Sequence, residues 1–137
     1  MGLFDRRARG VGIQLPTYTP PAARTSVIER VQYPLGGKES GGQIVATGPD
    51  IALDEQWSIE HAYVTCTSTT PTTLVVYAGM IGPQYLLDGS GSGNADTGEW
   101  PNGLLIPGGS RVIAVWTGAS TGAIAFLNLQ LTRLGRS

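Results

Sequence analysis

The sequence predicts an all-β fold, an eight-stranded antiparallel β-sandwich that is jelly-roll-like and carries an extended N-terminal arm. From Thr25 onwards, no stretch of useful length shows the roughly 3.6-residue period of an amphipathic helix. Short runs rich in β-branched and aromatic residues recur instead, and Gly, Pro, Asp or Asn closes each of them. These two patterns together are typical of a sandwich built from short strands.

Eight runs are predicted to be strands. They span residues 25–33, 42–46, 55–68, 72–80, 83–88, 103–106, 110–118 and 122–134. Alternation of apolar and polar residues indicates a strand with one buried face, and two of the runs show it clearly. The third run places one set of residues on a common face: Trp57, Ile59, His61 and Tyr63. The last run places another set on one face: Ala123, Ala125, Leu127, Leu129 and Leu131.

The centres of the strongest runs are expected to form the core. These core residues are Trp57, Ile59, Leu74, Val76, Val115, Leu127 and Leu129. A chain of 137 residues is long enough for one domain with a hydrophobic core of its own. We therefore expect a single sandwich domain over residues 25–137.

The first 24 residues differ in charge from the rest of the chain. They carry four arginines against one aspartate, a charge of +3, whereas residues 25–137 carry five basic and nine acidic groups, a charge of −4. Pro16, Pro20 and Pro21 favour an extended backbone, because proline fixes its own φ and restricts the residue before it. Residues 1–24 are therefore predicted to form a basic extended arm.

Composition excludes several classes of partner. Charged residues make up only 14% of the chain and the net charge is −1, so we expect neither a nucleic-acid nor a membrane partner. No apolar run approaches the roughly 18 residues of a membrane span. Cys66 is the only cysteine, which excludes an internal disulfide and a multi-cysteine metal site.

No motif indicates an enzyme. His61 is the only histidine, and its place in a predicted strand favours a structural role. A dyad of His61 with Cys66 is disfavoured, since residues five apart lie on opposite faces of an unbent strand. The stretch GSGSG has Gly91 where a nucleophile elbow needs its nucleophile. We expect no catalytic residues and no cofactor.

Residues 88–99, DGSGSGNADTGE, nearly match the calcium loop of an EF-hand. Asp88, Asp96 and Glu99 fall on ligand positions of that motif, but the flanking residues read as strand and turn rather than as helices. Ser90 and Ser92 stand where the motif has stronger ligands. The favoured prediction is a long, mobile loop without a resident metal. A weak calcium site on the three acidic residues stays open as the alternative.

Residues 72–132 contain a series of strand ends and turns with a family likeness. The matching residues are Val76, Tyr77, Gly79, Asp88, Gly89, Gly93, Asn94, Asp96, Ile106, Pro107, Gly109, Trp116, Gly118, Ala119, Gly122 and Ala123. This pattern resembles small jelly-roll virion structural proteins of tailed bacteriophages, particularly those of actinobacterial hosts. It departs from the family pattern in Ser90 for threonine and Ile106 for valine.

The resemblance implies a virion component: a head decoration, a neck or collar protein, or a tail protein. The expected location is the virion, and the expected partners are capsid, portal, neck or tail subunits and further copies of this chain. The arm is the expected anchor. Its candidate anchor residues are Leu3, Phe4, Arg6, Arg7, Arg9, Ile13 and Leu15, which combine an apolar tip, carboxylate-binding guanidiniums and a short strand-like stretch.

One face of the last predicted strand is a candidate assembly surface. Ile124 and Phe126 point away from the predicted core, followed by polar residues. Two large apolar groups on an otherwise polar face suit a contact with another subunit, although an N-terminal segment of the same chain would cover them equally well.

The alternative function is a carbohydrate-binding sandwich module for host attachment. Such modules present aromatic side chains to a sugar, and the candidates here are Trp57, Tyr85, Trp100 and Trp116. Trp100, beside the predicted loop, is the best candidate to face a host surface glycan.

Overall fold

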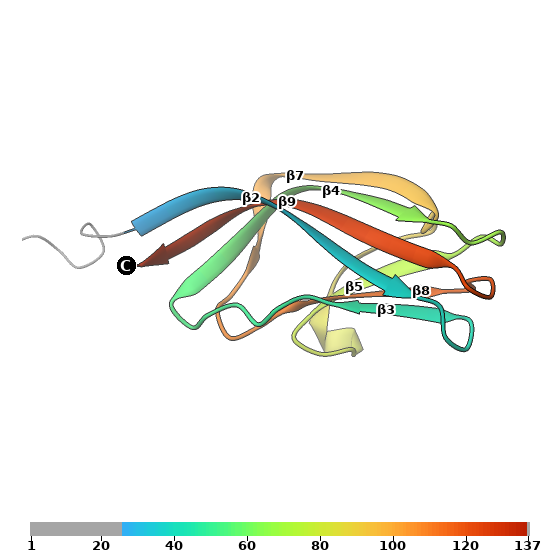
Figure 1. The fold of residues 1–137 in the computed structure, drawn as a ribbon. Coiled ribbons are helices and arrows are strands. Elements are labelled where there is room, and N and C mark those ends of the chain that lie inside the picture. The colour runs from blue at the N-terminus through green and yellow to red at the C-terminus, as the bar shows by residue number, and fades with distance from the viewer. Residues whose placement is uncertain (1–25, 137) are drawn as a thin grey trace, which may run out of the picture.

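The computed structural model describes residues 26–136 and confirms an all-β sandwich (Figure 1). Two four-stranded antiparallel sheets pack face to face, and one short 3-10 helix, η1 (Pro83–Tyr85), precedes β6. The predicted arm, residues 1–24, lies outside the described residues. Within the part that is described, no helix has the length and apolar character needed to cross a membrane.

The strand order is that of a jelly roll. The first sheet runs in the order β2 (Ser26–Lys38), β9 (Ile124–Arg136), β4 (Glu55–Cys66), β7 (Ala95–Ile106). The second runs in the order β3 (Gln43–Thr47), β8 (Val112–Thr117), β5 (Thr73–Ala78), β6 (Leu86–Ser90). The pairs β5–β6, β4–β7, β3–β8 and β2–β9 are therefore nested one inside the next, as in a long hairpin rolled up on itself.

All eight predicted strands are present, but two are longer than predicted. β2 continues to Lys38, although Pro34 and two glycines suggested an end near residue 33. Because β2 is an edge strand, Pro34 costs no ladder bond, and the Phe126 ring covers Gly36 so closely that a Cβ there would collide with it. β7 begins at residue 95 rather than 103.

The prediction that Trp57, Ile59, His61 and Tyr63 share one buried face of β4 is correct only for Trp57 and Ile59. The pairing register shifts between Ile59 and His61, which marks a β-bulge. A bulge inserts one residue and so exchanges the two faces of the strand beyond it. As a result Ala62 and Val64 are buried, whereas His61 is half-buried and Tyr63 is exposed.

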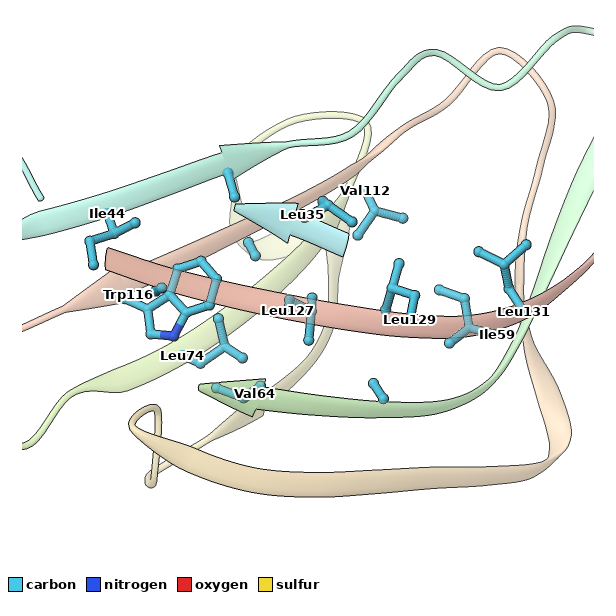
Figure 2. Close-up of a cluster of buried hydrophobic side chains, with 14 of the residues drawn as sticks. Leu35, Ile44, Ile59, Val64, Leu74, Val112, Trp116, Leu127, Leu129 and Leu131 are labelled. Carbon is cyan, nitrogen blue, oxygen red and sulfur yellow. The ribbon is translucent and has the colours of Figure 1, made fainter. Parts of the chain in front are cut away.

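Inward-facing side chains of both sheets form one core (Figure 2). Of the predicted core residues, five are buried in it: Trp57, Ile59, Leu74, Leu127 and Leu129. Val76 is partly buried against this core. Val115 is buried outside it, since it alternates with Ala114 and Trp116 and lies on the outer face of its sheet, paired with Val45 and Val75. The five predicted inward residues of the last strand, from Ala123 to Leu131, are all buried.

The carboxylate of Glu39 joins two turns at one end of the sandwich. It accepts hydrogen bonds from the N–H of Gly42, at 2.7 Å, and from the N–H of Gly122, at 3.0 Å. Gly42 belongs to the β2–β3 turn and Gly122 to the β8–β9 turn. These bonds, the one from Gly42 first, lower the pKa of Glu39 below its ordinary value, because they favour the charged form.

Replacement of Glu39 by glutamine is expected to change how stability depends on pH. Since the pKa is lowered by folding, the carboxylate stabilises the protein above its ordinary pKa of 4.5, and this contribution is lost as the pH falls through the folded-state pKa. The difference in unfolding free energy between wild type and Glu39→Gln should thus be largest near neutral pH and shrink in acid. Chemical denaturation over a pH series measures it. A difference that does not change with pH would show that the carboxylate does not join the turns.

Candidate functional site

The segment that resembles a calcium loop is mostly strand. Residues 88–90 belong to β6 and residues 95–99 to β7, so only residues 91–94 form the turn between them. The prediction of a long, mobile loop was wrong. Glycine and polar residues suggested a loop, but in this fold they lie on the exposed edges of two sheets, where burial demands no apolar alternation.

Hydrogen bonds from the body of the protein hold this turn in place. The buried indole Nε1–H of Trp116 donates to the Gly93 carbonyl at 3.0 Å, and the Gly93 N–H donates to the Thr72 carbonyl at 2.9 Å. The Thr72 hydroxyl donates to Asn94 Oδ1 at 2.5 Å, and the Asn94 amide donates in turn to the Thr70 carbonyl at 3.0 Å. The turn is therefore tied to β8 and to the β4–β5 connection.

Two glycines of this turn are expected to respond differently to alanine. A Cβ on Gly93 would lie 3.0 Å from Trp116 Cδ1 and would collide with the Thr72 hydroxyl, whereas a Cβ on Gly91 would have no atom within 4 Å. Gly93→Ala should therefore lower the free energy of unfolding by about 1–3 kcal/mol, as overpacking does. The matched variant Gly91→Ala should stay within about 0.5 kcal/mol of wild type in chemical denaturation. Equal losses would contradict this account of the turn.

The three acidic residues of the calcium-like motif do not converge. Asp96 accepts from the Ser90 hydroxyl and from the Thr97 N–H, and Asp88 accepts from the N–H of Gly89 at 2.7 Å. Glu99 instead lies across the strand pair from His61, with its Oε2 at 3.7 Å from the imidazole Nε2. Across residues 26–136, no three His, Cys, Asp or Glu side chains are grouped so that they could hold a metal ion.

Asp96 is the most strongly held of these carboxylates. The hydrogen bond from Ser90, followed by that from the Thr97 backbone, lowers the pKa of Asp96, because both stabilise its charged form. The carboxylate therefore stays ionised at neutral pH, yet two protein donors already occupy it. It forms a fixed negative charge on the surface.

Calcium titration is expected to show no site tighter than about 100 μM, the range of weak extracellular modules. The physical reason is that Glu99 points to His61 while Asp96 is bonded to Ser90, so that three ligands would have to rearrange together. Calorimetry on the wild type, with Asp96→Asn as control, measures the affinity. A submicromolar site that Asp96→Asn removes would overturn the expectation.

No nucleophile lies beside the histidine. His61 and Cys66 both follow the bulge in β4, so their separation of five residues still places them on opposite faces. Cys66 packs against the core, while His61 pairs with exposed Glu99 on the outer face. The geometry thus gives no base–thiol pair.

The tryptophans do not form an aromatic platform. Trp116 is fully buried and Trp57 is 4% exposed, packed against Tyr33 with ring centroids 5.7 Å apart. Trp100, the candidate to face a glycan, is partly buried against the core rather than freely exposed. Tyr85 is half-buried in η1.

An apolar patch lies on the outer face of the first sheet. Ile124 and Phe126 are each 44% exposed, and Tyr63 is 45% exposed. Phe126 pairs across the strands with Thr65 and with Gly36, and Tyr63 lies diagonally from it on the same face. We call Tyr63, Ile124 and Phe126 the outer patch.

A cleft enters the sandwich between its two sheets at the side where β6 and β7 are the edges. Inward apolar side chains from both sheets form its floor: Ala62, Val64, Leu74, Val76 and Leu127. Figure 2 shows Val64, Leu74 and Leu127 projecting into the space between the sheets, next to Trp116. Trp100 also lines the cleft. The volume of the cleft is about 140 Å³.

The rim of the cleft is polar and acidic. Asp88 and Ser90 come from β6, and Asp96 and Thr97 come from β7. On the opposite side of the sandwich the edge strands β2 and β3 contact each other, so that side is closed. Sequence reasoning singled out both aspartates for calcium, but it had no signal for the cleft, because the floor residues come from three separate strands, β4, β5 and β9.

Comparisons with known proteins give no family. No protein-family model matches the chain, and no curated protein matches it. A solved virus-like particle of the extra small virus of the giant freshwater prawn Macrobrachium rosenbergii is similar over 97% of both chains, with 13% identity and a TM-score of 0.40. The structure of infectious bursal disease virus, Gx strain, is similar over 94% of this chain and 46% of that chain, with 11% identity and a TM-score of 0.32. Likeness this loose transfers no function to the chain.

Proposed function

We propose that this chain is a structural protein of a tailed-bacteriophage virion, a capsid decoration or neck and collar component. In this role the N-terminal arm anchors the protein to the particle, and the sandwich is exposed on it. Its partners are capsid, portal, neck or tail subunits and other copies of the same chain. It performs no catalysis and needs no cofactor.

The outer patch is the observation that carries the proposal. Leu127 and Leu129 lie in the core and are 3% and 2% exposed. On the same strand, Ile124 and Phe126 remain 44% exposed. Together with Tyr63 they form a group of large apolar side chains on one sheet face. Contiguous exposed apolar groups on a folded domain are typical of surfaces that contact other subunits.

The jelly-roll topology is compatible with several functions, so fold alone does not choose among them. Among residues 26–136 no three His, Cys, Asp or Glu side chains are grouped as metal ligands, and His61 lies beside Glu99 rather than beside a nucleophile. The resemblance of residues 72–132 to phage virion proteins then favours a structural role. That resemblance includes turn residues that hydrogen bonds connect to other parts of the sandwich. Gly93 and Asn94 are bonded to Thr72 and Thr70, and the N–H groups of Gly118 and Ala119 both donate to the Gly42 carbonyl.

Carbohydrate binding is the second candidate function. Trp57 and Trp116 are buried and cannot stack on a sugar, so of the three tryptophans only Trp100, partly buried in the cleft, supports carbohydrate binding. A glycan-array signal that disappears in Trp100→Ala would favour this function over a structural one.

Deletion of residues 1–24 is expected to leave a folded sandwich that no longer joins its particle. The arm carries a charge of +3, which complements the charge of −4 on residues 25–137, and it contains the candidate anchor residues. Circular dichroism checks folding, and negative-stain imaging of particles labelled at the C-terminus measures occupancy. Wild-type occupancy of the truncated chain would overturn the anchoring role.

Two aspartate variants test the outer patch in the same assay. Phe126→Asp places a charge in the patch but also uncovers Gly36, and Ile124→Asp places the same charge without uncovering it. Loss of assembly in both variants supports a subunit contact. If both assemble as wild type does, the patch is not an interface.

A further inference from the structure

The cleft between β6 and β7 has the shape and the charge of a receptor for a short peptide. Its floor is apolar and its rim carries two carboxylates, Asp88 and Asp96. Neither carboxylate has a basic partner among residues 26–136 within salt-bridge distance. A segment that binds in the cleft should therefore carry an apolar side chain and, close to it in the sequence, positively charged side chains.

We propose that the cleft receives the tip of the arm of a neighbouring copy of this chain. Phe4 enters the apolar floor, and Arg6 and Arg7 meet the carboxylates of the rim. This inference rests on the proposed function, since it names the place where one arm anchors in an assembly.

The volume of the cleft suits a single aromatic ring. An apolar cavity of roughly 150 Å³ accepts a benzene-sized group, and this cleft measures about 140 Å³. The chain contains two phenylalanines. Phe126 lies on the outer face against Gly36, so Phe4 is the phenylalanine that the predicted arm can offer to the cleft.

The spacing of the arm matches the rim. Arg6 and Arg7 follow Phe4 by two and three residues, a reach of ~7–10 Å in an extended backbone. A guanidinium binds a carboxylate through two parallel hydrogen bonds, which gives the contact direction as well as charge. Asp96 accepts from Ser90 on one oxygen and from the Thr97 N–H on the other, so each oxygen keeps an acceptor position that a guanidinium can use without breaking these bonds, whereas a calcium site would need several carboxylates to rearrange together.

The topology favours a neighbouring copy over the chain's own arm. The arm joins the body at Ser26, beside Arg136, on the edge strand β2. The cleft lies at the opposite edge of that sheet and toward the other end of the strands, since Leu127 of its floor pairs with Leu35. An arm that entered its own cleft would have to reverse along about 30 Å of sheet and cross it, at about 3.3 Å per residue. The arm of an adjacent copy is not bound to that path, and disulfide trapping separates the two cases.

Disulfide trapping in the full-length chain tests the proposal. In a Cys66→Ala background, Leu3→Cys is combined with Thr97→Cys on the rim of the cleft. The matched control combines Leu3→Cys with Thr47→Cys, an exposed threonine on β3, which is the edge strand of the other side. A non-reducing gel should show a ladder of linked chains for the Thr97 pair and not for the Thr47 pair. Phe4→Ala, which removes the ring, should lower the ladder yield at least about tenfold.

A charge exchange gives a second readout. Asp88→Arg should lower the yield of the Thr97 ladder about threefold or more, and adding Arg6→Asp and Arg7→Asp should restore it. Phe4, Arg6 and Arg7 belong to the predicted arm, outside the described residues, so the arm variants remain informative if Asp88→Arg does not fold. A monomer with an internal disulfide, equal ladders from Thr97 and Thr47, or no ladder at all would each overturn the proposal.

Failure of this inference is distinguishable from failure of the proposed function. If deletion of residues 1–24 abolishes incorporation but the Thr97 ladder is absent, the arm anchors on a different surface. In that case only the assignment of the cleft as its binding site is wrong. If the truncated chain is incorporated at the wild-type level, the arm is not the anchor, whatever the result of the gel.

Discussion

Trp116, Leu74 and Leu127 meet between the two sheets, and the rest of the structure depends on this contact. Each strand by itself exposes one apolar face, which is stable only when the opposing sheet covers it. Nesting of the strand pairs brings residues from distant parts of the sequence to this interface. The indole of Trp116 also reaches the β6–β7 turn, because its N–H donates to the Gly93 carbonyl between the end of β6 and the start of β7.

That interface also determines where binding surfaces exist. Close contact of β2 with β3 seals one side of the sandwich, and at that side Glu39 ties the adjoining turns together. On the other side β6 and β7 leave the inward side chains of the core within reach of an external group. A cleft of this kind is an extension of the core, so an aromatic ring that fills it gains the same burial that stabilises the fold.

Apolar residues on the outer faces of the two sheets differ in their exposure. Val115 is buried on the outer face of the second sheet, where it pairs with Val45 and Val75. Ile124, Phe126 and Tyr63 stay exposed on the first sheet. Other large apolar side chains are exposed as well, but these three share one sheet face, and this grouping is what supports the proposed subunit contact.

The sequence by itself determined the β class, the number of strands and the buried face of the last strand, because a period of two residues is a local property of the chain. It could not place the outward turn of His61 and Tyr63, since the bulge in β4 depends on pairing with β7 and β9. Nor could it show that residues 88–99 are mostly strand, because their order comes from Trp116 and Thr72, which lie elsewhere in the chain. The candidate aspartates were visible in the sequence, but the cleft beside them was decided only by the tertiary structure, which brings residues of five strands from two sheets together at one edge.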